Sequence, residues 1–177
     1  MCYNDVIKEK GGLDVADERK ITTVCFTGHR DIPTSLACRI PTALKNRLRR
    51  YIMQGAYRFR VGGAIGFDTV VELCVLELKE EFPHIELELV IPCPNQTRGW
   101  SDEMKRVYNY ILSRANRVEC VSDRYTSHCM HDRNRRLVDE SQVCIAFLQK
   151  NYGGTAYTYA YALRRGIEVV NLYDEIK

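Results

Sequence analysis

The run ITTVCFTGHR, residues 21–30, decides the fold. Its β-branched and apolar residues up to Thr27 predict a buried strand, and Gly28 allows the chain to turn tightly where that strand ends. Apolar residues then recur at every fourth position from Leu36 to Ile52, which is the pattern of an amphipathic helix. A strand, a glycine turn and a helix in this order predict the first unit of an α/β fold.

The same alternation continues along the chain. Strands are expected at 59–63, 86–91, 117–121, 142–148 and 167–172, and helices at 67–82, 104–112, 134–139 and 155–165. Six strands alternating with five helices predict a Rossmann-like three-layer sandwich, with a mostly parallel sheet and helices on both faces. We expect a single domain of this kind over residues 21–177. Residues 1–20 lack an apolar period and are expected to form a flexible N-terminal arm.

The composition is that of an ordinary globular protein, with 45% hydrophobic and 28% charged residues. A net charge of +3 is too small to indicate a nucleic-acid partner by itself. No apolar run reaches the roughly 20 residues that are needed to cross a bilayer. Residues 1–20 also lack the basic-then-apolar order of a signal peptide. We therefore expect a cytoplasmic protein with no membrane partner.

The eight cysteines do not indicate disulfides or a metal site. No C-x-x-C pair occurs, and four of the cysteines fall in apolar strand or helix patterns, where free cysteine acts as a small hydrophobic residue: Cys25, Cys74, Cys120 and Cys144. Residues 128–131 hold two histidines and a cysteine, but a fourth ligand at zinc-like spacing is missing. We expect reduced thiols, no metal and no required cofactor.

Candidate binding residues follow the first two strands, because ligands of parallel α/β sheets bind outside the carboxyl ends of the strands. After the first strand come Gly28, His29 and Arg30, and arginine is a bidentate partner for phosphate. After the second strand, glycines lead into a helix whose free N–H groups attract anions. Asp68 lies in the first turn of that helix, where it contacts a ribose hydroxyl or only supports the helix dipole. The glycines are Gly62, Gly63 and Gly66.

A second glycine turn, made by Gly153, Gly154 and Thr155, follows the fifth strand and also opens onto a helix. It is therefore a second candidate cradle for an anion, with a hydroxyl at its mouth. Just before that strand, Arg133 and Asn134 stand at the expected start of a helix. We expect them to face the same site, and the alternative is a solvated basic face.

The loop over residues 92–100 contains the only tryptophan of the chain, Trp100, together with Gln96 and Arg98. An indole in such a loop can stack on a base of a ligand, or it can pin the loop to the domain. We include these three side chains among the candidate ligand-binding residues.

Together these motifs resemble the SLOG superfamily of Rossmann-like nucleotide-binding proteins, and within it the YpsA-type family. The resemblance covers nearly everything from Ile21 onward, and it implies a nucleotide-binding domain. It rests on FTGHR at 26–30, GGAIGFD at 62–68, the 92–100 loop, RNRRLVDES at 133–141 and GGTAYTYAYALRRGIEVV at 153–170.

Two further families share parts of this pattern. The chain is similar to the DNA-processing protein DprA, whose fold binds single-stranded DNA. It is also similar to the LOG phosphoribohydrolases, whose G-G-x-G-T-x-x-E turn carries a glutamate that takes part in glycosidic cleavage. Thr158 stands where that glutamate is expected, and a neutral hydroxyl cannot stabilise an oxocarbenium-like centre as a carboxylate does.

Three functions follow from these residues. The leading hypothesis is a protein that senses or sequesters a nucleotide derivative, such as an ADP-ribose- or NAD-like compound, and it requires no catalytic residue. The second is a nucleotide-processing N-glycosidase, for which His29, Asp68 and Asp132 are the acid–base candidates. The third is a DprA-like binder of single-stranded DNA, which requires a basic groove with aromatic platforms.

The last helix carries Tyr157 and Tyr161, which are expected to lie on its outer face. Exposed tyrosines often mark a contact between subunits, so we expect a homo-oligomer. The residues expected to face the core are then Ala156, Tyr159, Ala160 and Leu163.

Overall fold

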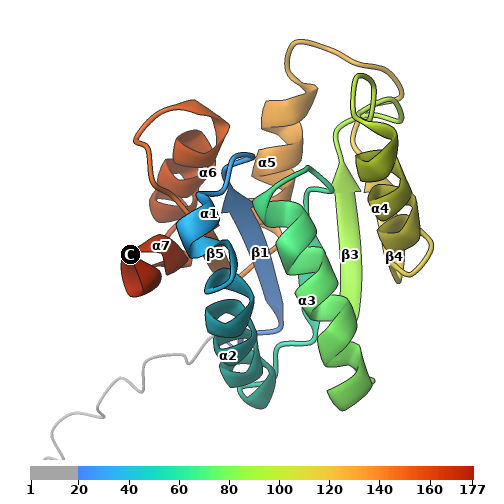
Figure 1. Cartoon of the computed structure of the whole chain (residues 1–177). Helices are drawn as coiled ribbons and strands as arrows, with labels where there is room; N and C mark the ends of the chain where they lie inside the picture. The colour runs from blue at the N-terminus through green and yellow to red at the C-terminus, as the bar shows by residue number, and fades with distance from the viewer. Residues whose placement is uncertain (1–19) are drawn as a thin grey trace, which may run out of the picture.

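The computed structural model describes residues 20–177, so the arm expected over residues 1–20 lies, except for Lys20, outside the described residues. Six strands form one sheet in the order β4-β3-β2-β1-β5-β6, and every neighbouring pair is parallel (Figure 1). They are β1 (Thr23–Gly28), β2 (Arg58–Val61), β3 (Glu86–Ile91), β4 (Arg117–Cys120), β5 (Val143–Phe147) and β6 (Glu168–Asn171). The predicted Rossmann-like α/β fold with a sheet of six strands is confirmed.

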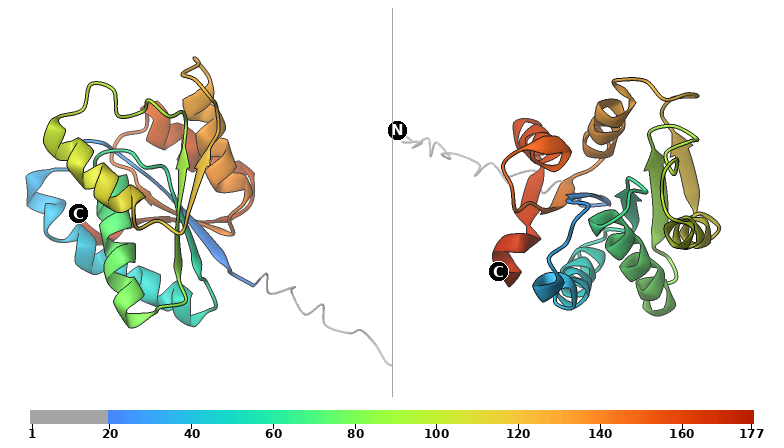
Figure 2. Two further views of the ribbon diagram at one scale, coloured as in Figure 1. Left: turned by 90° about the vertical axis from the view of Figure 1, so that its right-hand side faces the viewer. Right: turned by 45° about the horizontal axis from the view of Figure 1, so that its top comes forward.

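Helices cover both faces of the sheet, as the left view of Figure 2 shows. Helices α2, α3 and α4 lie on one face, and α5 and α6 lie on the other. The helices are α1 (Thr34–Ala37), α2 (Ile40–Met53), α3 (Phe67–Glu81), α4 (Asp102–Leu112), α5 (Cys129–Asp139), α6 (Gly153–Arg164) and α7 (Leu172–Ile176). No helix within residues 20–177 is both long and apolar enough to cross a membrane.

Strand β1 lies inside the sheet and is buried on both faces, which explains its uninterrupted apolar sequence. Val24 and Phe26 belong to the larger hydrophobic core, which α2 and α3 complete, whereas Cys25 belongs to the smaller core beneath α5 and α6. Strands β1 and β5 end at the same level, with Gly28 opposite Phe147. The loops that follow these two strands therefore begin beside each other.

The structure differs from the predicted helices at three places. The helix expected from Leu36 to Ile52 is divided into α1 and α2, and Pro41 lies in the first turn of α2, where a missing N–H does no harm. Helix α5 starts at Cys129, five residues earlier than expected, because the Thr126 hydroxyl accepts a hydrogen bond of 3.0 Å from the Cys129 N–H. Helix α7 was not predicted.

The buried face of α6 also differs from the prediction, since Leu163 is 55% exposed and the buried residues are Thr155, Thr158 and Ala162. Thr158 is accommodated there because its hydroxyl donates a 2.8 Å hydrogen bond to the Gly154 carbonyl. Tyr157 and Tyr161 are half-buried and stack on each other, with ring centroids 6.3 Å apart.

The two tyrosines also bond to α5 of the same chain. The Tyr157 hydroxyl accepts a hydrogen bond of 2.7 Å from Arg135, and the Tyr161 hydroxyl donates one of 2.8 Å to Asp139. Both tyrosine hydroxyls therefore have hydrogen-bond partners within the same chain. The homo-oligomer stays a prediction that these two tyrosines do not support.

Candidate functional site

A cleft of about 390 Å³ lies at the carboxyl ends of the strands, between the loop after β1, the start of α3, and helices α5 and α6. Eight of the residues singled out in the sequence line it, and Phe26, Thr27, Ala64 and Met130 complete its walls. These eight are Gly28, His29, Arg30, Asp68, Arg133, Asn134, Gly154 and Thr155. Residues from four separate loops and helices therefore meet at the edge that the fold predicts for a ligand.

Gly62, at the end of β2, allows Arg133 to approach the backbone closely. A Cβ atom at Gly62 would lie 1.3 Å from Nη1 of Arg133, so any other residue there would displace the guanidinium group. Gly66, with φ of +92°, lies against the backbone of Arg30 in the same way. Gly62 and Gly66 thus shape the cleft because they let Arg133 and the backbone of Arg30 lie close to the chain after β2.

Asp68 lies at the cleft, 6% exposed, in the first turn of α3. Its carboxylate lies 3.5 Å from Nη1 of Arg133 and accepts a hydrogen bond of 3.3 Å from the Ala64 N–H. Burial raises the pKa of Asp68, and the charge of Arg133 opposes that rise. The negative charge of the buried Asp68 carboxylate is therefore only partly compensated by Arg133 and by the Ala64 N–H of the glycine turn.

Glu72 is a buried carboxyl group that the sequence interpretation missed. It lies one helical turn after Asp68, is 1% exposed, and its Oε1 has no hydrogen-bond partner in the described structure. Burial, followed by the charge of Asp68, raises the pKa of Glu72 well above its usual range. The signal in the sequence was the i, i+4 spacing, which places both carboxyls on one face of a helix.

His29 ties together the loops that follow β1 and β5. Its Nε2 accepts hydrogen bonds from the backbone N–H groups of Gln149 and Lys150, at 3.1 and 3.2 Å. Burial and the positive charge of Lys150 lower the pKa of His29. The imidazole is therefore neutral, with its proton on Nδ1, and its Nε2 is not available as a base.

Helix α6 begins at the cleft with Gly153, which has φ of +84°. Tyr152, at the N-cap, provides no side-chain hydrogen bond to the first turn. The N–H groups of the first residues of a helix have no partner within the helix, and they carry the positive end of its dipole. Gly154 and Thr155 therefore place the start of this helix, with its unpaired N–H groups, at the lining of the cleft.

The loop between β3 and α4 does not line the cleft. Gln96 donates a hydrogen bond of 3.0 Å to the Gly63 carbonyl, and so supports the glycine turn from outside. Trp100 packs edge-on against Tyr108, with ring centroids 5.6 Å apart, and Arg98 is exposed. Of the two roles considered for the indole, the structure shows the one that pins the loop to the domain.

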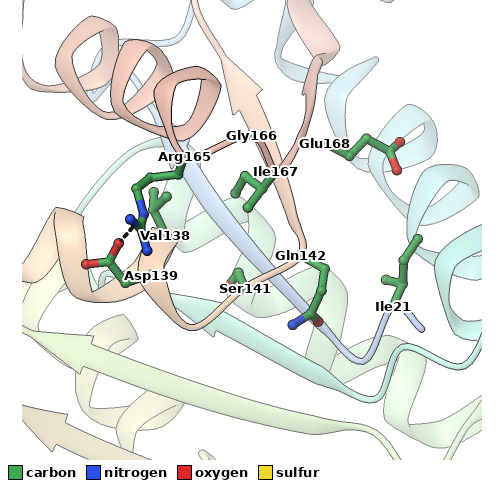
Figure 3. A pocket seen from close by; sticks show the side chains of 9 residues that line it. All are labelled: Ile21, Val138, Asp139, Ser141, Gln142, Arg165, Gly166, Ile167 and Glu168. Carbon is green, nitrogen blue, oxygen red and sulfur yellow. Dashed lines mark ion pairs between the residues drawn. The ribbon is translucent and has the colours of Figure 1, made fainter. Parts of the chain in front are cut away.

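A second hollow, also of about 390 Å³, lies at the opposite ends of the strands (Figure 3). Its polar groups have partners within the protein. Arg165 and Asp139 form an ion pair of 2.9 Å, and the Gln142 side-chain oxygen accepts hydrogen bonds from the N–H groups of Thr22 and Thr23. It is therefore a seam between β1, β5 and the ends of α5 and α6, with fewer free polar groups than the first cleft.

Within residues 20–177, no three histidine, cysteine or acidic side chains are placed to hold a metal ion. The seven cysteines in this part of the chain are free.

Comparisons with known proteins agree with the fold. The prophage-derived protein YoqJ of Bacillus subtilis is 28% identical over 62% of this chain and 71% of its own. The DprA structure from Streptococcus pneumoniae is 17% identical, with a TM-score of 0.61, over 85% of this chain. A structure of DprA from Helicobacter pylori, described as giving insight into its unique single-stranded DNA binding mode, is 16% identical, with a TM-score of 0.60.

The match spans 50% of the Streptococcus pneumoniae DprA chain. For the Helicobacter pylori protein, it covers 88% of this chain and 71% of the DprA chain. These similarities show a shared fold.

A family model described as the YspA SLOG family, under the name YpsA, matches residues 33–171. The match covers β2 to β6 and four of the five sequence motifs, whereas FTGHR lies just before it. The chain therefore belongs to the YpsA family of SLOG proteins.

Proposed function

We propose that the cleft binds a nucleotide derivative, such as an ADP-ribose- or NAD-like compound, without breaking its glycosidic bond. One observation carries this proposal: the first turn of α6 and two arginines, Arg30 and Arg133, face the same cleft. Backbone N–H groups at a helix start and guanidinium groups are the two usual partners of phosphate in proteins.

The phosphate is expected at the N–H groups of Gly154 and Thr155. Arg30 is exposed at the mouth of the cleft and reaches an anion there without losing an existing partner. An ionised Asp68 would repel a phosphate, so its carboxyl group is the expected partner of a ribose hydroxyl. The cleft volume lies at the lower end of the range of ligand sites, which fits a ligand with part of its surface in solvent.

The positions of Thr158, His29 and Asp132 support binding rather than hydrolysis. Thr158 is buried and bonded to Gly154 of its own helix, so no carboxylate stands at the position of the LOG glutamate. His29 uses its free nitrogen to hold two loops. Asp132 is exposed and lies in another hollow beside Arg135 and Arg136. Binding without turnover is the function that this geometry supports best.

Calorimetry with AMP, ADP-ribose and NAD tests the proposal. An arginine contact to phosphate contributes roughly 1.5–3 kcal/mol, so Arg30→Ala should weaken binding about ten- to a hundredfold. Arg50→Ala, which removes an exposed arginine on α2 outside the cleft, is the matched control and should bind as the wild type does. Equal affinities of all three proteins would show that the cleft is not the site. Release of free adenine from AMP would show turnover and favour the hydrolase.

Single-stranded DNA is the second candidate ligand, because DprA shares the fold and because Tyr152, beside the cleft at the start of α6, is 70% exposed. An exposed aromatic side chain next to an anion site can stack on a base. A short oligonucleotide in the same calorimetric series separates the two functions. Tighter binding of DNA than of every mononucleotide and dinucleotide would favour the DprA-like function.

A further inference from the structure

Beneath the cleft, two buried carboxyl groups lie near one guanidinium group. Asp68 and Glu72 lie on consecutive turns of α3; Arg133 of α5 forms an ion pair with Asp68, and its charge also acts on Glu72. The ion pair is long, with 3.5 Å between Arg133 Nη1 and Asp68 Oδ2. One positive charge therefore compensates a site that would carry two negative charges if both acids were ionised.

This cluster also has unused hydrogen-bonding capacity. The Nε of Arg133 and the Oε1 of Glu72 are buried, and neither has a partner in the described structure. Arg133 lines the cleft as well as contacting Asp68. Its guanidinium group can therefore turn toward an anion in the cleft by giving up only a weak contact with Asp68.

We propose that binding of an anionic nucleotide in the cleft is coupled to the uptake of one proton by Asp68, with Glu72 protonated both before and after binding. This inference rests on the proposed function. The phosphate takes over the charge of Arg133 and adds a negative charge nearby. The carboxylate of Asp68 then accepts a proton from solvent and becomes a neutral acid, while Arg133 stays charged.

The groups around Asp68 support this assignment. Burial has already raised its pKa with Arg133 beside it, so the loss of that cation raises the pKa further. Tyr108, from α4, is neutral because burial raises its pKa. Arg30 is a further cationic side chain that lines the cleft. His29 is the other group at the cleft that could accept a proton, and it must first release the two N–H groups that it holds.

The test is calorimetry of ADP-ribose at pH 7 in buffers of different ionisation enthalpy, which counts the protons taken up. ADP-ribose is the suitable probe because each of its phosphates has a single, strongly acidic oxygen. AMP is not, since the second pKa of a phosphomonoester is about 6. The wild type should take up between zero and one proton. Its Kd should increase with pH between 6 and 8, by up to about tenfold per pH unit.

Three variants locate the proton. Asp68→Asn should bind ADP-ribose with no proton uptake and a Kd that does not depend on pH. Glu72→Gln resembles the protonated acid and should keep the uptake of the wild type. Glu80→Gln, on the exposed face of α3, is the matched control and should also keep it.

If the wild type binds ADP-ribose with the same heat in every buffer, the proposal is wrong and the proposed function still stands. If Asp68→Asn keeps the uptake, the proton goes to another group, and His29→Asn then shows whether it is His29. If ADP-ribose does not bind at all, the proposed function itself fails.

Discussion

At the scale of single residues, the cleft depends on a close approach between Arg133 and the backbone of Gly62. A methyl group at that position would overlap the guanidinium group, as the distance of 1.3 Å shows. Because Arg133 is also the partner of Asp68, a change at Gly62 acts on the charges of the cleft through a residue that is close in space but distant in the sequence.

We predict that Gly62→Ala lowers the affinity for ADP-ribose at least about tenfold, which corresponds to the loss of one charge-assisted contact. Titration calorimetry measures the effect. The control is Gly99→Ala, since Gly99 lies outside the cleft and a Cβ there meets no atom within 4 Å. That variant strains a positive φ, by about 1–2 kcal/mol, but should leave the affinity unchanged. Unchanged affinity in Gly62→Ala would mean that Arg133 takes no part in binding.

His29 gives the protein a pH dependence of known sign. Its pKa is lowered in the folded protein, so between that value and the ordinary value of about 6.5 the unfolded chain binds more protons. The stability that the neutral imidazole contributes is therefore present above about pH 6.5 and is lost as the pH falls below it.

Thermal unfolding of the wild type and of His29→Ala from pH 7.5 to 5 checks this prediction. The wild type should be the more stable at pH 7.5, and the difference should shrink toward pH 5. His84→Ala removes an exposed histidine between α3 and β3 and should show no such trend. A difference that is constant or grows on acidification would contradict the role assigned to His29.

At the scale of elements, the sequence predicted each strand to within two residues at either end, because apolar residues recur in the strands and the inner strands β1 and β5 are buried on both faces. The helices were less predictable. Thr158 is buried on α6 through a hydrogen bond to its own helix, and the early start of α5 depends on the Thr126 hydroxyl. Such local bonds leave no apolar period in the sequence.

The candidate site was predictable to a similar degree. Glycines and arginines at strand ends indicated most of the cleft, since the topology of a parallel sheet brings these loops together. Glu72 was missed because its role depends on burial beside Asp68, and Trp100 was assigned to the site although it packs on Tyr108. The surroundings of both side chains are set by tertiary contacts, which the sequence pattern does not show.

A charged residue inside the sheet was also not predicted. Arg60 on β2 is fully buried, with Nη2 2.7 Å from Glu119 of β4 and Nε 3.2 Å from Glu88 of β3. It joins three neighbouring strands beneath the C-terminal end of α5, where it also contacts Glu140. Removing it leaves the buried carboxylate of Glu88 with less compensation.

We therefore predict that Arg60→Leu lowers the free energy of unfolding by about 3–5 kcal/mol, as expected when one partner of a buried ion pair is removed. Arg49→Ala is the comparison, because Arg49 pairs with Glu81 on the surface at 2.8 Å and both side chains are more than 40% exposed. Its effect should not exceed about 1 kcal/mol. Urea unfolding measures both. Similar effects of the two substitutions would show that the buried network adds no more than a surface pair.

At the scale of the whole molecule, the fold places two hollows of equal volume at opposite ends of the sheet. They differ in their free polar groups. The hollow of Figure 3 is closed by the pair of Arg165 and Asp139 and by the bonds of Gln142. The other combines a helix start with two arginines, and on this difference we propose the ligand site at the carboxyl ends of the strands.

Titration of the ¹⁵N-labelled protein with ADP-ribose, followed through its backbone amide resonances, tests this assignment most directly. The account predicts that the largest shifts fall on Gly154 and Thr155, with further shifts at Ala64 in the glycine turn. The spectrum of ADP-ribose itself should stay that of the intact compound. Shifts concentrated around Gln142 and Gly166 at the opposite end of the sheet, or no shifts at all, would contradict the account.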